Sequence, residues 1–171
     1  MKEIKKIIFL FMLVLNFQAS FAQYNYLQIN LEIQTSKKEN NNIRISLYQE
    51  DSVSFFLGIK KNPILNSKDY KTWLKRDADT IIKISKEDFN LVTEKIMGLS
   101  SFEVLKGMNQ SNPIIGNDGT GVILEIVLTM DKISYTIWNP SCDTKKRKLE
   151  PFLAICKELV LLAKMNPNDY F

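Results

Sequence analysis

Histidine is absent from this chain of 171 residues, and cysteine occurs only twice. Without an imidazole, the chain can form neither a Ser-His or Cys-His nucleophilic pair nor a His-based site for zinc, copper or iron. The two cysteines do not form a CxxC motif, which argues against a thiol-disulfide exchange centre. No catalytic motif stands out elsewhere, so we predict that the protein is not an enzyme and needs no cofactor.

Glycine and proline are also scarce, with six and five residues, which excludes collagen-like and low-complexity sequences. The hydrophobic content of 45% is too high for a disordered tail. A chain of this length can bury a core of its own, and no internal repeat or linker divides it. We therefore expect one domain.

The N-terminal segment has the three parts of a secretory signal peptide. Three lysines lie within the first six residues, residues 7–15 are all apolar, and the small residues Ala19 and Ala22 suit a cleavage site. The apolar run is too short to span a bilayer, which takes about 20 residues. We predict cleavage after Ala22, a soluble domain over residues 23–171 without a membrane anchor, and a periplasmic or extracellular location.

The leader accounts for much of the basic character of the chain. It contains three lysines and one glutamate, so its removal lowers the net charge from +4 to +2. Nucleic-acid binders present a dense basic face, and a nearly neutral domain is not expected to bind nucleic acid.

One dense run of positive charge remains at residues 145–148, which include Lys145, Lys146 and Arg147. It directly precedes a predicted helix, where cations oppose the helix dipole, so a solvated loop is one interpretation. The other is a patch that meets an acidic partner, with Tyr135 and Trp138 nearby as aromatic anchors. Trp138 is equally compatible with a place in the core.

Hydrophobic periodicity predicts the fold class. Runs with strand-like patterning cover residues 23–35, 43–47, 53–60, 80–84, 122–128 and 133–138. Ser85 and Asp88 form a variant capping box that opens a helix with one apolar stripe, and Pro151 suits the first turn of a final helix ending near Met165. We predict a two-layer α+β domain, with a mainly antiparallel sheet of about five to six strands and two helices on one face.

Residues 100–121 are the longest stretch without a clear period. The segment GNDGTG at its end precedes a strand rather than a helix, so a turn around Asp118 is favoured over a phosphate-binding loop. Loops of about 20 residues in compact domains often carry function. We therefore include Asn117 and Asp118 among the predicted partner contacts, with Tyr135, Trp138 and the basic run.

The two cysteines allow two interpretations. Cys142 is predicted in a loop and Cys156 on the final helix, and an even pair in an exported protein favours a disulfide, which we predict here. Closing a loop of about 15 residues would add roughly 3 kcal/mol of stability. The alternative is that Cys156 is a small core residue, because Phe152, Ile155 and Leu159 share its helical face.

The C-terminal half also contains a set of short motifs: Asp118-Gly119-Thr120, Leu124-Glu125, Tyr135, Trp138-Asn139-Pro140 and a closing Leu-rich helix. In these motifs the chain resembles small exported periplasmic α+β proteins, and its Ala-Gln cleavage junction is similar to those of the Bacteroidota. Several such proteins resemble immunity proteins, which bind and occlude a toxin aimed at the cell envelope. The resemblance implies one protein partner and transfers no catalytic residue.

Three functions remain open. The leading hypothesis is a periplasmic, non-enzymatic interaction protein, most concretely an immunity protein against an envelope-targeting toxin. The second is a carrier or sensor of a small apolar ligand, with a pocket lined by Phe55, Phe56, Phe89 and Phe102.

The third hypothesis is a hydrolase acting on cell-wall sugar or peptide. Such an enzyme needs two carboxylates across a cleft, and Glu125 and Asp118 are the candidates. The ordinary explanation of Glu125 is a paired or edge-exposed glutamate on a strand.

Overall fold

The structure is a computed structural model that describes residues 27–35, 42–63, 78–99, 119–128 and 131–171. These residues form the strands β1 (Gln28–Thr35), β2 (Ile43–Gln49), β3 (Phe55–Lys61), β4 (Thr80–Ile84), β5 (Thr120–Val127) and β6 (Lys132–Trp138). They also form the helices α2 (Lys86–Met97) and α4 (Glu150–Leu162) and the short 3-10 helix η1 (Pro167–Asp169). Within these residues the strands make one sheet in the order β4-β3-β2-β1-β5-β6, and every neighbouring pair is antiparallel.

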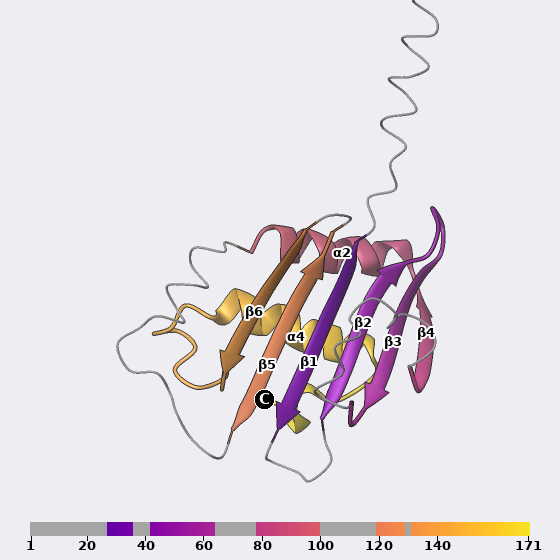
Figure 1. Ribbon diagram of the computed structural model, residues 1–171. Helices are drawn as coiled ribbons and strands as arrows, with labels where there is room; N and C mark the ends of the chain where they lie inside the picture. Colours follow the sequence, from indigo (N-terminus) through magenta and orange to yellow (C-terminus); the bar gives the residue numbers. More distant parts are fainter. Residues whose placement is uncertain (1–26, 36–41, 64–77, 100–118, 129–130) are drawn as a thin grey trace, which may run out of the picture.

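Both helices lie on the same side of the sheet, so the molecule has two layers (Figure 1). The predicted α+β fold, with an antiparallel sheet and two helices on one face, is confirmed. In the described part of the chain no helix is long and apolar enough to cross a bilayer.

The core lies between the sheet and the helices. Side chains alternate between the two faces of a strand, and on β1 the apolar set Ile29, Leu31 and Ile33 is completely buried. The antiparallel register places Leu31 between Ile45 of β2 and Leu124 of β5, so the apolar sets of three strands coincide. We call this helix-covered side the inner face and the opposite side the outer face.

Helix α2 begins as the sequence predicts. The Ser85 hydroxyl accepts a hydrogen bond from the backbone N–H of Asp88 at 3.0 Å, which satisfies a donor that the first turn leaves unpaired. Its buried residues include Phe89, Val92 and Ile96 of the predicted stripe, whereas Leu99, the fourth residue of that stripe, lies beyond the end of the helix at Met97 and is half-buried.

Helix α4 carries Pro151 in its first turn, as predicted, and buries Phe152, Cys156 and Leu159. It ends at Leu162, before the predicted end near Met165. The reason is the backbone of Lys164, whose φ of 58° is left-handed and cannot continue a right-handed helix.

Strand β5 begins at Thr120, before the predicted start at Val122. The buried hydroxyl of Thr120 donates to the backbone carbonyl of Tyr170 at 2.7 Å. This contact joins the start of the strand to the segment after α4. The contact joins residues far apart in the chain, and the glycine-rich sequence before Val122 gives no local sign of it. The earlier start of β5 was therefore not predicted.

The predicted disulfide is wrong. Both thiols are free, with Cys142 exposed in the turn after β6 and Cys156 completely buried in α4. Cys142 is held at the surface because its backbone N–H donates to Asn139 and its carbonyl accepts from Arg147. Burial raises the pKa of the Cys156 thiol, so Cys156 is the core residue of the alternative interpretation.

Several predicted features fall outside the described residues. They are the leader and its cleavage site, the stretch 100–118 with Asn117 and Asp118, and Phe102.

Candidate functional site: the outer face of the sheet

The outer face is made of the polar alternate residues of the strands. Strand β1 contributes Gln28, Asn30, Glu32 and Gln34, which lie between the inner-face residues along the chain. The register adds residues from the neighbouring strands that share this side: Arg44, Ser46, Tyr48, Phe56, Lys60, Ile123, Glu125, Val127, Lys132, Ser134, Thr136 and Trp138. No helix of the described chain covers this side (Figure 1).

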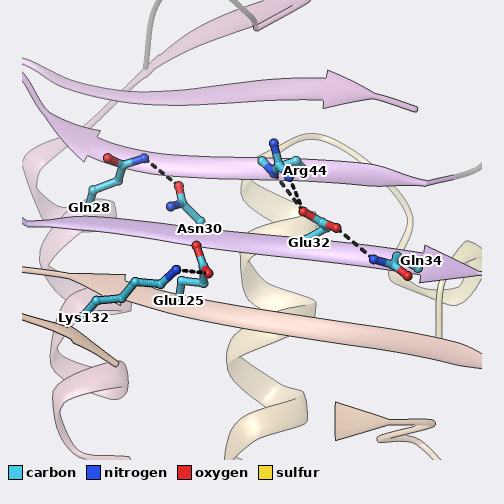
Figure 2. Close-up of polar contacts among 7 residues, drawn as sticks. All are labelled: Gln28, Asn30, Glu32, Gln34, Arg44, Glu125 and Lys132. Atoms are coloured by element: carbon cyan, nitrogen blue, oxygen red, sulfur yellow. Dashed lines mark hydrogen bonds and ion pairs between the residues drawn. The ribbon is translucent and has the colours of Figure 1, made fainter. Parts of the chain in front are cut away.

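Three of these side chains form a connected charged cluster. Glu32 accepts from the Arg44 Nε at 3.0 Å and also from the Arg44 Nη2, both through the carboxylate oxygen Oε2. Its other oxygen, Oε1, accepts from the Gln34 amide at 2.9 Å (Figure 2). The Arg44 and Glu32 side chains are only 11% and 12% exposed, so this ion pair is largely shielded from water.

A second set of contacts continues the cluster along β1. The Gln28 amide donates to the Asn30 side-chain oxygen at 2.7 Å, and Lys132 pairs with Glu125 (Figure 2). Asn30 lies directly opposite Glu125 across β1 and β5, so these two pairs are neighbours in the sheet. We call these seven residues the polar ladder: Gln28, Asn30, Glu32, Gln34, Arg44, Glu125 and Lys132.

The polar ladder contains two carboxylates on neighbouring strands. Glu32 and Glu125 are diagonal neighbours across β1 and β5, a relation that separates α-carbons by about 7–8 Å. Glu125 is bound to a lysine, and both oxygens of Glu32 are occupied by protein donors. The ordinary explanation of Glu125, a paired glutamate on a strand, is the one observed. Among the described residues no group of His, Cys, Asp and Glu side chains is arranged to hold a metal ion.

Apolar side chains interrupt the polar ones on the same face. Tyr48 and Phe56 stack at a centroid distance of 5.8 Å, and Ile123 and Val127 are half-buried beside Glu125. Tyr48 is only 3% exposed, and Gln28, Ser46 and Glu32 are buried as well, so the outer face is largely enclosed over β1 and β2. Its exposed part lies over β6, at Lys132, Ser134 and Thr136.

The four phenylalanines of the carrier hypothesis do not share one pocket. Phe55 and Phe89 are in ring contact in the core, at a centroid distance of 4.7 Å. Phe56 lies on the opposite face of the sheet, stacked on Tyr48.

Trp138 lies on the outer face at the end of β6, which answers whether it belongs to the core or the surface. Its half-buried ring packs over Gly119 and Gly121. A Cβ built on Gly119 would lie only 3.0 Å from a ring atom of Trp138, so a residue with a side chain at this position would crowd the indole. Gly119 just before β5 and Gly121 within it thus make room for the indole.

The remaining predicted contacts are divided between core and surface. Tyr135 is only 4% exposed and packs edge-on against Phe152, so it belongs to the core and offers no surface anchor. Lys145 and Lys146 are exposed.

Arg147 acts inside the turn rather than at a partner surface. Its guanidinium donates to the carbonyls of Trp138, Asn139 and Cys142, at 3.0, 2.7 and 3.3 Å. Partial burial lowers the pKa of the Arg147 guanidinium from its ordinary value.

The sequence alone did not identify the polar ladder. Four polar side chains at alternate positions of β1 are the ordinary pattern of an antiparallel strand with one side toward solvent, so they gave no separate signal. Their partners come from strands far along the chain, which no local pattern indicates.

Comparison of the chain with protein-family models and with curated protein sequences finds no match. A function for this protein therefore has to be argued from the chemistry of the outer face.

Proposed function

We propose that this protein is an exported, non-enzymatic binding protein that holds one partner protein against the outer face of its sheet. The proposal depends on one observation, the polar ladder, whose side chains are already bonded to one another. A surface whose rotamers are fixed in advance loses less conformational entropy when a partner docks. The strands beneath the ladder provide a rigid support for it.

The size of the face sets how much of a partner it can hold. Strands about 4.8 Å apart and about seven residues long, at about 3.4 Å per residue, give it an extent of roughly 24 Å each way. That is roughly 600 Å², less than the about 800 Å² that one side of a standard interface buries, and the side chains over β1 and β2 are largely buried already. A partner of ordinary size would therefore contact the exposed part over β6 and extend past the edge of the sheet.

The more specific form of the proposal is an immunity protein, whose partner is a toxin directed at the cell envelope. It is supported by the predicted export and by the resemblance of the C-terminal motifs to immunity-like periplasmic proteins. An immunity protein needs a rigid complementary surface and no chemistry of its own, which is consistent with a face whose carboxylates are occupied.

Two double variants test the proposed binding surface. Ser134→Arg with Thr136→Arg places two bulky cations on exposed outer-face positions of β6, outside the polar ladder. The matched control, Asn90→Arg with Glu94→Arg, places the same residues on the exposed surface of α2. Both proteins should keep the melting temperature of the parent, because neither change touches a buried side chain.

The tagged proteins are recovered from the native periplasm, and bound proteins are quantified by mass spectrometry. We expect one stoichiometric partner with the parent and with the α2 control, and its loss from the β6 variant because bulky side chains prevent close approach. Equal recovery by the β6 variant contradicts the proposal, as does the absence of any partner during growth with neighbouring bacteria. Loss of protection against a purified toxin by the same variant tests the immunity form.

A further inference from the structure

The connection between β6 and α4 is a braced turn, although it has no regular structure. We call residues 139–149 the basic turn; it leads from the end of β6 to the start of α4 (Figure 1). Arg147 donates to two of its carbonyls, those of Asn139 and Cys142, and to the carbonyl of Trp138 just before it. The Thr144 hydroxyl donates to the Pro140 carbonyl at 3.1 Å. The last residue, Leu149, is completely buried and fixes its end in the core.

The basic turn displays positive charge from which the fold gains little. Lys145, Lys146 and Lys148 are exposed, and they precede the N-terminus of α4, where the helix dipole disfavours cations. In the described part of the chain Lys145 and Lys148 form no ion pair. The one acidic residue of the basic turn is Asp143, and Glu150 follows it at the start of α4, so the positive charges outnumber the acidic residues.

The basic turn is continuous with the outer face. It begins directly after Trp138, whose ring packs on that face and whose carbonyl accepts from Arg147 at 3.0 Å. A partner that covers β6 and extends beyond its end would therefore meet the three lysines. The basic turn would therefore add charged contacts beyond the edge of the small outer face.

We infer that the basic turn is the recognition element for an acidic segment of the partner protein. The inference rests on the proposed function and adds the chemistry of the partner, a cluster of carboxylates that reaches past the end of β6. Lysines at the rim of an interface mainly steer association and select among partners, so binding should weaken as salt is added.

A membrane surface is the less suitable occupant. The large exposed apolar side chains of the described chain are Val53, Ile81, Leu91, Met97, Ile133 and Leu161. None of them belongs to the basic turn, so nothing there can insert among lipids. Three lysines near an anionic bilayer give only weak attachment.

The test compares two charge-reversed proteins with the parent. Lys145→Glu with Lys146→Glu reverses two charges of the basic turn, and Lys86→Glu with Lys157→Glu makes the same net change on the helical layer. The first probe is a fluorescent poly-glutamate peptide, followed by anisotropy at increasing salt. The second probe is vesicles of phosphatidylglycerol and phosphatidylethanolamine, followed by co-sedimentation.

We expect the parent and the helical control to bind the peptide alike, and the basic-turn variant to bind about tenfold more weakly at low salt. Equal peptide binding by the two variants, or vesicle binding by the parent in preference to the peptide, overturns the inference. Capture from the periplasm separates the two claims. If the β6 variant loses the native partner and the basic-turn variant keeps it unchanged, the proposed function stands and this inference fails.

Discussion

Replacing Arg44 with methionine removes the cation of an enclosed ion pair while keeping an unbranched side chain. Breaking a buried pair costs about 3–5 kcal/mol, whereas exposed pairs contribute about 0–1 kcal/mol. The Arg44 and Glu32 side chains are 11% and 12% exposed, and Gln34 still donates to Glu32 in the variant. We therefore expect the free energy of unfolding to fall by about 2–3 kcal/mol. In a domain of this size that lowers the melting temperature by about 5–10 °C.

Chemical denaturation and thermal melting of Arg44→Met, Glu32→Gln and the double variant form a double-mutant cycle. We expect the double variant to lose less stability than the two single variants together, with a coupling of about 1–2 kcal/mol. Lys60→Met is the control, because Lys60 and Asp79 form an ion pair of which each side chain remains about two-fifths exposed. Its melting temperature should fall far less than that of Arg44→Met.

The reasoning is refuted if Arg44→Met is as stable as Lys60→Met, or if the cycle is additive. Either result would mean that the ion pair is open to water in solution. The polar ladder would then not be organised in advance, and the binding face would lose its main physical support.

Three further predictions concern the core and the acid limb of stability. A maleimide should label only Cys142 in the native protein and reach Cys156 only after unfolding, because Cys156 is buried and burial raises its pKa; absence of reactive thiols under denaturing conditions contradicts this. Phe152→Ala should lower the free energy of unfolding by about 3–5 kcal/mol in urea titrations, since the ring is completely buried, and a loss below about 1 kcal/mol would contradict the packing of α4. A lysine side chain and a backbone N–H hold the pKa of Asp79 below its ordinary 3.8. Its contribution to stability is therefore present above the ordinary pKa and lost as pH falls through the folded one. Asp79→Asn should flatten the melting temperature against pH below about pH 4, and an unchanged acid limb would refute this.

The elements of this fold follow closely from local patterns. The strand-like pattern over residues 23–35 predicted a strand there, and the apolar residues of that pattern, Ile29, Leu31 and Ile33, lie on the buried inner face. The Ser85 cap was also predictable, because a hydroxyl before the first turn satisfies a nearby backbone donor. Such features depend on residues a few positions apart, so they can be predicted from the sequence.

The candidate site was less predictable because its residues are brought together from a distance. In the sequence, the amides and the carboxylate of β1 match the solvent-exposed side of a half-buried strand. Only the pairing of the strands shows that Arg44 and Glu125 lie beside them. Tyr135 was expected at the surface and lies in the core, since the position of β6 in the sheet determines which of its sides meets Phe152.

The amino-acid order alone specified the two-layer plan, because periods of two and of about 3.6 residues assign strands, helices and their apolar sides. Long-range pairing settled the rest. Cys156 faces the core while Cys142 stays outside with the Arg147-braced turn, and Trp138 finds room over glycines of the neighbouring strand segment. These outcomes depend on contacts between segments far apart in the chain, and the free energy of such contacts exists only once the sheet has assembled.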